Sequence, residues 1–538
     1  MKKGQWAALM AAFLGWMFDG FEIGLFPLVA QPALKDMLPG SAESLIGNWI
    51  GVMTAAFLVG AATGGVVFGW LGDRIGRVRA MSLSILAYAI FSGLCGFVTA
   101  PWQLFLFRFL ASLGMGGEWS LGVSLVMEIW PNKSRGWLAG AIGAAANVGF
   151  VLVAVFSSVL NQVMDSVITM LSSSGLSEDM VARLTSNGGW RILAMAAAAP
   201  ALLTFIVRVF VPESEKWEQE HAKGSTKQWS TPDLLAVVLG AIAALGLVSL
   251  WALDDWLRNP ELPVNHPDQF SLPMWIRISG TVIGLVIAYF GYTYPIRRYL
   301  QRSQAQNADQ GETFWTTSRV LGRMLLGATL GGVALLGTWA SLQNAAPWAG
   351  RLVEQNIEAQ HPNASPEELR AIKKLPESQA LTAHARANTQ IWSGIAAIVF
   401  TMIAALVGDA IGRRLSYFLL CVTALVSSLV FFQTNTTVDA KFYATVFLAG
   451  GLTASFYGWL PLYLPELFPT RVRAFGQGFA FNFGRILAAV GALQFSYLMN
   501  NVFDGQYPKA CTVLSFIYVI GMVVIWFAPE TKGEPLPE

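Results

Sequence analysis

Charged residues are scarce in this sequence. Only 13% of its 538 residues are Asp, Glu, Lys or Arg, whereas 54% are hydrophobic and the mean hydropathy is +0.51. Soluble domains usually carry about 25% charged residues. The formal net charge of +2 at pH 7 gives no basis for a nucleic-acid partner. The composition therefore argues against an ordinary soluble domain and predicts a protein embedded in a lipid bilayer.

Cysteine and histidine are also few. The cysteines lie in apolar stretches, where cysteine behaves as a small core residue, so we expect neither disulfides nor a metal site. The histidines lie in polar stretches, which argues against a histidine relay inside the membrane. These residues are Cys95, Cys421, Cys511, His221, His266, His361 and His384. The sequence also shows no phosphate-binding loop and no nucleophile near a histidine. It predicts no enzyme and no cofactor, and transport energised by a gradient rather than by ATP.

Long apolar runs are present instead. Each has about 20 residues, enough for a helix to cross about 30 Å of hydrocarbon. Windows of about 19 residues predict roughly fourteen membrane-spanning helices, and hence an all-α integral membrane fold. The predicted spans are 5–30, 48–70, 79–99, 102–127, 136–160, 190–211, 232–253, 273–294, 316–343, 390–408, 414–433, 440–464, 473–499 and 508–528. We expect the first run to remain as a helix, because no small-residue cleavage site follows Met1-Lys2-Lys3.

The distribution of lysine and arginine predicts the orientation. Most basic residues fall in cytoplasmic connections if both chain termini are cytoplasmic. The loop 344–389 would then be external, and its basic residues are balanced by glutamates, so we expect a folded, charge-neutral cap. Within it, Ser365-Pro366-Glu367-Glu368 is a typical helix start, with an N-cap residue, a proline at the first position and a capping-box glutamate.

Two motifs occur twice, at nearly the same displacement. Gly72-Asp73-Arg74-Ile75-Gly76-Arg77 recurs as Gly408-Asp409-Ala410-Ile411-Gly412-Arg413, and the pair Glu128 and Arg135 recurs as Glu466 and Arg473. Such repetition predicts two homologous halves, as in transporters built from parallel repeats. We expect a six-helix bundle over 1–212, a cytoplasmic linker with an inserted helix pair over 213–314, and a second six-helix bundle over 315–538.

These motifs resemble those of the major facilitator superfamily, in its sugar-porter and metabolite:proton symporter branches. The resemblance covers both halves and rests on Gly69-x3-Asp73-Arg74-x-Gly76-Arg77, Arg108, Glu128, Arg135-Gly136, Val211-Pro212-Glu213-Ser214, Pro465-Glu466 and Pro529-Glu530-Thr531. It implies the major facilitator fold and transport by alternating access.

Three segments are more specifically similar to bacterial sialic-acid:proton symporters, which are also thought to carry an extra central helix pair. They are Leu14-Gly15 through Asp19-Gly20-Phe21-Glu22, Gly114-Met115-Gly116-Gly117-Glu118-Trp119 and Pro212-Glu213-Ser214-Glu215-Lys216-Trp217. The pattern there is usually DGFD, so Glu22 replaces its second aspartate, and Ala410 replaces a basic residue of the second signature loop. The resemblance implies a pair between Asp19 and Arg108, and a sugar acid as substrate.

Three acids fall within the predicted spans. Asp19 lies near the middle of the first span, with Glu22 one turn further on the same face, and Glu118 lies among glycines in the fourth. A carboxylate at mid-membrane is costly and usually pairs with a cation or exchanges a proton. Arg108 is the expected partner of Asp19. Proton coupling through these four residues and a static role in helix packing both remain open.

Arg485 in the span 473–499 is a second mid-depth cation, with Asn482 three residues before it. A guanidinium grips a carboxylate through two hydrogen bonds, which favours an anionic substrate; a structural arginine at a helix end is the alternative. We expect substrate contacts from Arg108, Asn147, Asn482, Arg485, Trp119 and Tyr457, although the aromatic residues could instead pack or face lipid.

Paired charges flank the connections on the predicted cytoplasmic side of both halves. Positive-inside bias explains the arginines but not the acids, so we expect a salt-bridge latch that closes an inner gate in one state and breaks in the other. The predicted gating and signature residues are Gly69, Asp73, Arg74, Gly76, Arg77, Glu128, Arg135, Asp409, Arg413, Glu466 and Arg473.

These observations together predict a monomeric, proton-coupled symporter of a small organic anion, such as sialic acid, in a bacterial inner membrane. Its partners would be the substrate, protons and the bilayer. The alternative is a proton-coupled or facilitative carrier of a neutral sugar or an aromatic acid. A non-transporting sensor built on a carrier scaffold would be expected to add a soluble signalling domain.

Overall fold

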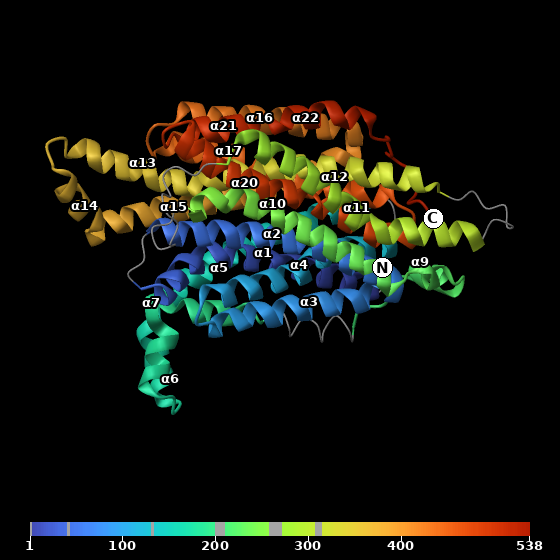
Figure 1. Ribbon diagram of the computed structural model, residues 1–538, viewed down its shortest axis with the longest axis horizontal. Helices are drawn as coiled ribbons and strands as arrows, with labels where there is room; N and C mark the ends of the chain where they lie inside the picture. The colour runs from blue at the N-terminus through green and yellow to red at the C-terminus, as the bar shows by residue number, and fades with distance from the viewer. Residues whose placement is uncertain (1–2, 40–42, 131–133, 200–209, 258–271, 307–314) are drawn as a thin grey trace.

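The computed structural model describes residues 3–39, 43–130, 134–199, 210–257, 272–306 and 315–538. Within these ranges the chain is helical and contains no strand, and its long helices run side by side along the long axis (Figure 1). Helices satisfy their own backbone groups, which suits a lipid environment. The principal helices are α1 (Lys3–Met37), α2 (Glu43–Ile75), α3 (Arg77–Leu94), α4 (Pro101–Ile129), α5 (Arg135–Gln162), α6 (Met164–Ser173), α7 (Glu178–Ala196), α9 (Glu215–Ala222), α10 (Leu234–Leu257), α11 (Met274–Gln306), α12 (Thr317–Ala340), α13 (Ala345–Gln360), α14 (Pro366–Lys374), α15 (Pro376–Ile411), α16 (Arg413–Thr434), α17 (Ala440–Ala454), α18 (Phe456–Tyr463), α19 (Arg473–Asn482), α20 (Gly484–Asn501), α21 (Tyr507–Ser515) and α22 (Ile517–Val524).

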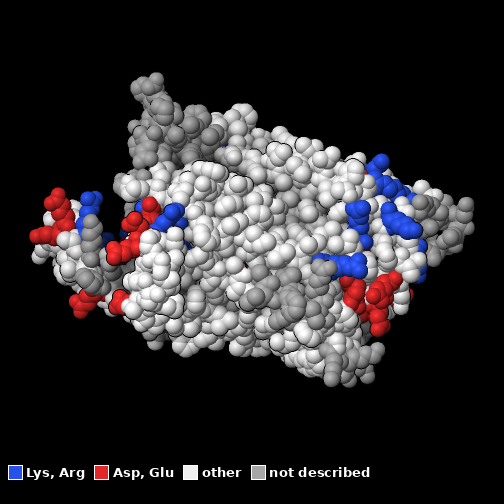
Figure 2. Space-filling model, turned by 90° about the horizontal axis from the view of Figure 1, so that it is seen from below, with Lys and Arg blue, Asp and Glu red and all other residues white. Residues whose placement is uncertain are grey.

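Twelve helices in the described residues are long and apolar enough to cross a membrane, against roughly fourteen predicted. Two predicted spans account for the difference. Span 190–211 runs partly outside the described residues. Span 440–464 is divided at Ser455 into α17 and α18, which have 15 and 8 residues. On the face in Figure 2, charged residues gather at the two ends and leave an uncharged band between them. The all-α, multi-pass membrane fold is confirmed.

The first half of the molecule, α1 to α7, packs against the second half, α12 to α22. The seam between them is formed chiefly by α2 against α19 and by α5 against α15 and α18. Close approach depends on glycine: a Cβ on Gly478 would lie 2.1 Å from the Gly65 carbonyl oxygen, and one on Gly143 would lie 2.2 Å from that of Tyr457. Pro461 within α18 has no N–H to offer the Tyr457 carbonyl four residues earlier. The part of α18 around Tyr457 contacts α5 backbone to backbone.

The inserted pair α10 and α11 lies beside this seam and contacts both halves. Tyr292 of α11 is hydrogen-bonded to Thr63 of α2 at 2.7 Å. Its ring also lies edge-on to Phe483, with ring centroids 6.1 Å apart. Trp229, just before α10, stacks on Tyr299 of α11 at 4.2 Å. The pair thus packs on a helix of each half rather than standing apart in the membrane.

The predicted external loop 344–389 is a helical hairpin. It contains α13, α14 and the first turns of α15, which begins 14 residues before the predicted span because helix continues into the polar segment. The predicted start at Ser365 is confirmed: Ser365 and Glu368 cap each other reciprocally. Lys373 pairs with Glu358 across the hairpin. Figure 1 shows α13 and α14 at the end of the molecule opposite the chain termini.

Candidate functional site

A buried ion-pair network joins the two halves at one end of the helices. Arg77 Nη1 lies 3.0 Å from Asp73 Oδ1, and Arg77 Nη2 lies 3.2 Å from Glu128 Oε1. Arg473 of the second half reaches the same Glu128 oxygen at 2.7 Å. Asp73 also accepts a hydrogen bond from the backbone N–H of Phe475, at the start of α19, where the helix dipole favours an anion. First-half residues therefore hold the N-terminus of a second-half helix.

The repeated motif builds a second, more open set of pairs. Arg413 Nη2 lies 2.7 Å from Glu466 Oε1, and Arg135 of the first half lies 3.7 Å from the same oxygen. Asp409 lies 3.4 Å from Arg413, but its side chain is 41% exposed, whereas that of Asp73 is fully buried. We call the seven residues Asp73, Arg77, Glu128, Arg135, Arg413, Glu466 and Arg473 the latch, and this end of the molecule the latch end.

Two glutamates outside the predicted gating set support the latch. Glu213 accepts hydrogen bonds from the backbone N–H groups of Arg77 and Val78, and Glu530 accepts them from Arg413 and Arg414. Each therefore caps the helix that begins with a latch arginine. Burial raises the pKa of Glu213. Burial also opposes ionisation of Glu530, yet its backbone donors hold the pKa of Glu530 below the usual range.

Three further signature residues serve packing around the latch. Gly76 has φ +108°, and a Cβ there would lie 2.3 Å from Glu213 Oε2, so both backbone and space require glycine. Gly69 lets α2 approach α19, because a Cβ would lie 2.8 Å from the Ala474 carbonyl oxygen. Arg74 lies outside the ion-pair network and donates to Thr231 Oγ1 at 2.7 Å.

Arg108 pairs with Glu22 rather than with the expected Asp19. The antiparallel register of α1 and α4 explains this difference. A Cβ on Gly15 would lie 1.6 Å from Glu118 Oε1, so position 15 of α1 faces position 118 of α4. Because the two helices are antiparallel, Arg108 lies about three helical turns further along, toward the C-terminal end of α1. The Arg108 guanidinium accordingly lies 4.5 Å from the centroid of the Phe26 ring. Glu22 is within its reach there.

Asp19 and Glu118 form a separate buried site between α1 and α4. Both side chains are buried, and the Glu118 carboxylate occupies the space left open by the missing side chain of Gly15. The two carboxylates are electrostatic neighbours. The two carboxylates are close enough to share a hydrogen bond when one of them carries a proton. The nearby cation for Asp19 is Arg485 of the second half, which attracts it electrostatically.

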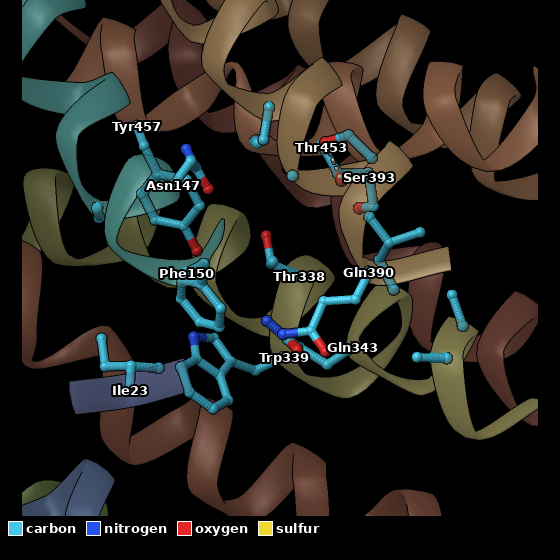
Figure 3. Close-up of a pocket in the computed structure, with 18 of the residues that line it drawn as sticks. Ile23, Asn147, Phe150, Thr338, Trp339, Gln343, Gln390, Ser393, Thr453 and Tyr457 are labelled. Atoms are coloured by element: carbon cyan, nitrogen blue, oxygen red, sulfur yellow. Dashed lines mark hydrogen bonds between the residues drawn. The ribbon is translucent and has the colours of Figure 1, made fainter. Parts of the chain in front are cut away.

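A cavity of about 250 Å³ lies between the halves, and the acid pair lies between this cavity and α4. Trp16 and Ile23 of α1 line it, whereas Glu22 faces Arg108 of α4. Asp19 does not line the cavity but lies one helical turn from both Trp16 and Ile23. Figure 3 shows its polar side chains converging from α5, α12, α15, α17 and α18 on a common space. Those lining it are Asn147, Thr338, Gln343, Gln390, Ser393, Thr453, Tyr457 and Arg485. Amides, hydroxyls and one guanidinium suit a polar, anionic molecule.

Arg485 is the residue common to the acid pair and the cavity. It lies in the first turn of α20, and its guanidinium carbon is 5.4 Å from the centroid of the Phe481 ring. Its Nε and Nη1 atoms are buried without a hydrogen-bond partner in the described part of the chain. It can therefore donate to a new anion without breaking an existing hydrogen bond.

One face of α19 and α20 connects the latch to the cavity. Its residues recur every four positions, and three of them have a partner on α4. Arg473 pairs with Glu128, Gln477 donates to Ser124 at 3.0 Å, and the Phe481 ring stacks on Trp119 at 3.9 Å. Arg485 follows at the cavity, roughly 18 Å from the latch by helical rise. The latch and the aromatic stack both separate the cavity from the latch end.

Three predicted substrate contacts lie elsewhere, and one of them, Arg108, is the partner of Glu22. Asn482 is fully buried and donates to the carbonyl oxygens of Gly116 at 2.9 Å and Gly478 at 3.0 Å, so it joins α19 to α4. Trp119 lies behind Phe481. Sequence reasoning missed Thr338, Gln343, Gln390, Ser393 and Thr453, because polar residues near helix ends are common and carry no distinguishing pattern. Glu213 and Glu530 had a signal, since each follows a proline in a motif repeated between the halves.

The comparisons with known proteins agree with this architecture. The chain is 22% identical over 530 residues to the cis,cis-muconate transport protein of Acinetobacter baylyi, covering 98% of this chain and 95% of that one. It is 24% identical over 577 residues to low affinity inorganic phosphate transporter 4 of Medicago truncatula, covering 100% and 92%. The structure of the proton:xylose symporter XylE bound to 6-bromo-6-deoxy-D-glucose superposes with a TM-score of 0.62 at 16% identity, covering 99% of this chain and 98% of that chain.

The family of sugar (and other) transporters matches residues 7–233 and 378–538, which include both sets of latch residues. The unmatched segment holds the inserted pair α10 and α11, the helix α12 and most of the helical hairpin formed by α13 to α15. The chain therefore belongs to the sugar (and other) transporter family of the major facilitator superfamily: it is a multi-pass membrane transporter, not an enzyme.

Proposed function

We propose that the protein is a proton-coupled symporter of a small organic anion. The observation that carries this proposal is the position of Arg485, which faces the cavity and attracts Asp19 electrostatically. A buried guanidinium can bind a substrate carboxylate through two hydrogen bonds. When Asp19 is ionised it competes for that guanidinium; when Asp19 binds a proton, Arg485 is released for the substrate. Proton and anion binding then favour each other.

The acid pair provides the proton site. Two buried carboxylates side by side cannot easily both be ionised, so a proton shared between Asp19 and Glu118 is the economical state. Glu22 is already neutralised by Arg108, which supports a structural or secondary role for that pair. Because Asp19 and Glu118 are buried and do not line the cavity, whereas Arg485 does, the proton and the substrate occupy separate sites.

A hydroxylated sugar acid such as sialic acid is the proposed substrate. The amides and hydroxyls around the cavity support a molecule with many hydroxyl groups, and the family name includes sugars. The related muconate and phosphate transporters are both named for anions, which supports the negative charge. An aromatic acid is the second candidate, because Trp16, Phe150, Trp339 and Phe481 supply aromatic surface. A neutral sugar would leave Arg485 without a partner.

The latch supports alternating access. In this structure the latch is formed, and the stacked Phe481 and Trp119 rings lie between the latch and the cavity. This arrangement is expected for a state closed at the latch end. Positive-inside bias supports a cytoplasmic latch end, with both termini there, in a bacterial inner membrane. Release of the substrate to that side requires the Arg473–Glu128 and Arg135–Glu466 pairs to separate.

The test is uptake by the purified protein in liposomes, with and without an inward proton gradient. The panel contains sialic acid, hexuronates, cis,cis-muconate, aromatic acids and neutral hexoses. We expect gradient-driven accumulation of one acid and none of the hexoses. Equal, gradient-independent movement of neutral hexoses would contradict both the anionic substrate and the coupling.

A further inference from the structure

A second cavity, of about 420 Å³, opens at the latch end on the outer surface of the second half. It lies between the first turns of α12, the start of α16 and the chain segment after α22. Arg319 and Arg323 of α12 and Arg414 of α16 line it, together with Phe527 and Pro529. Three guanidinium groups from two helices thus face one space.

The charge of these arginines is not balanced by ion pairs within the described residues. Arg323 donates to the Leu467 carbonyl oxygen at 3.0 Å, and Arg414 donates to that of Ala528 at 2.6 Å. Arg319 is exposed and lies over the Trp315 ring, with its guanidinium carbon 4.7 Å from the centroid. The latch arginines, in contrast, each lie against a carboxylate.

Nearby carboxylates do not fill the site. Glu530 is held by the backbone N–H groups of Arg413 and Arg414, which leaves it committed to capping α16. Glu534 acts on Arg323 electrostatically without forming an ion pair with it. Mutual repulsion among like charges makes such a cluster unfavourable unless an anion binds it.

The surroundings of the cavity are those of a membrane surface. Phe527 in its wall is 80% exposed, and Trp526, Leu325 and Leu415 nearby are exposed as well. An apolar, outward-facing surface beside a basic pocket matches a molecule that has an anionic head and an apolar tail. Basic pockets between membrane helices on the cytoplasmic side commonly take acidic lipid headgroups.

We propose that this cavity, which we call the arginine pocket, binds the phosphate group of an acidic phospholipid at the latch end of the bilayer. The phosphate accepts hydrogen bonds from Arg319, Arg323 and Arg414, and the acyl chains lie along Phe527 and Leu325. The site is separate from the transport cavity and does not depend on the identity of the transported substrate.

The test is retention of phosphatidylglycerol by the full-length protein, measured by native mass spectrometry after exchange into detergent. Phosphatidylcholine with the same acyl chains is the control, because its zwitterionic headgroup carries a phosphate but no net charge. Arg319→Gln is the primary variant, because the Arg319 side chain makes no hydrogen bond within the described residues and its loss should leave folding intact. Arg319→Gln with Arg414→Gln is the second variant. Arg298→Gln is the matched control, because Arg298 is an exposed arginine of α11 whose side chain is hydrogen-bonded to Gln301.

We expect wild type and Arg298→Gln to retain phosphatidylglycerol over phosphatidylcholine. Binding should weaken about fivefold in Arg319→Gln and further in the double variant, because each basic residue near the membrane surface contributes about that factor. A parallel melting series with inorganic phosphate, against chloride at equal ionic strength, distinguishes the source of the anion. Stabilisation of wild type but not of the double variant, without lipid retention, would assign the pocket to soluble phosphate. Equal lipid retention and equal melting in all variants would overturn the proposal.

Discussion

Arg485 has two kinds of neighbour: the carboxylate of Asp19 on one side and the open cavity on the other. This arrangement differs from a static ion pair, in which both partners would be satisfied. The buried Nε and Nη1 atoms of Arg485 have no partner in the described part of the chain, so the protein holds donors ready for a ligand. We propose that these unsatisfied donors bind the substrate, which would account for an unpaired polar group in the interior.

Replacing Arg485 with lysine tests the need for a planar, two-pronged donor. Lysine keeps the positive charge but not the fork. We expect Arg485→Lys to raise the KM for the transported acid by roughly tenfold to a hundredfold, because one charge-assisted hydrogen bond contributes about 1.5–3 kcal/mol. Uptake kinetics in liposomes measure this change. Arg298→Lys serves as the control, and an unchanged KM in Arg485→Lys would remove Arg485 from the substrate site.

Gly15 tests the position of Glu118. A Cβ there would lie 1.6 Å from Glu118 Oε1, so Gly15→Ala must displace the carboxylate. We expect this variant to reach the membrane but to lose most proton-driven uptake. Gly51→Ala in α2 is the matched control, because a Cβ at Gly51 meets nothing within 4 Å and alanine is the better helix former. Normal uptake by Gly15→Ala would show that the location of Glu118 does not matter.

In each half, one helix that begins with a latch arginine is capped by a glutamate. Glu213 caps α3 and Glu530 caps α16, yet burial raises the pKa of Glu213 while backbone donors keep that of Glu530 low. A carboxyl whose pKa is raised in the folded protein stabilises the fold below its unfolded-state pKa. This stabilisation is lost as the pH rises through the folded-state pKa. A carboxyl with a lowered pKa stabilises above its unfolded value and loses that effect as pH falls through its folded value.

The corresponding glutamine variants should therefore respond to pH in opposite directions. When the pH is raised from about 4 to about 7, the loss of stability caused by Glu530→Gln relative to wild type should increase. The loss caused by Glu213→Gln should decrease. Each effect should be within about 0.5–2 kcal/mol, the usual range for a helix cap. Melting temperatures of the purified protein across this pH range measure both. Parallel pH profiles would contradict the assigned environments of the two glutamates.

The sequence predicted most of the spans and all seven latch residues, because a charge repeated beside two apolar runs has few structural explanations. It did not predict the Arg108–Glu22 pair, since the register of α1 against α4 is set by packing at Gly15 and Glu118. The division of span 440–464 at Ser455 was missed because it leaves hydropathy unchanged. The early start of α15 was missed because its first turns are polar. The cavity amides Gln343 and Gln390 were not predicted, because their convergence with the predicted Asn147 depends on how the helices pack.

The whole molecule is arranged as two bundles that meet at the latch, with the cavity between them. Glu128 is central to this arrangement, because it neutralises Arg77 of its own half and Arg473 of the other. Removing its charge leaves two buried arginines facing each other. Breaking a buried pair in this way costs about 3–5 kcal/mol, enough to move a two-state equilibrium from one side to the other.

Glu128→Gln should accordingly shift the population toward a state open at the latch end. Spin labels at Arg79 of α3 and Ser318 of α12, both exposed, report the distance between the halves at this end. We expect the distribution to lengthen in Glu128→Gln and to stay unchanged in Glu367→Gln, which alters an exposed acid of the external hairpin. An unchanged distribution in Glu128→Gln would mean that the latch does not control the conformation.

The central claim is that Asp19 couples the proton to the substrate through Arg485. The most direct measurement compares two transport modes of Asp19→Asn in liposomes: accumulation driven by a proton gradient, and exchange of labelled for unlabelled substrate without a gradient. Asparagine resembles a permanently protonated Asp19 and leaves Arg485 free for substrate. We predict that accumulation is lost and exchange is retained. Accumulation by Asp19→Asn at the wild-type level and with wild-type pH dependence would contradict the account.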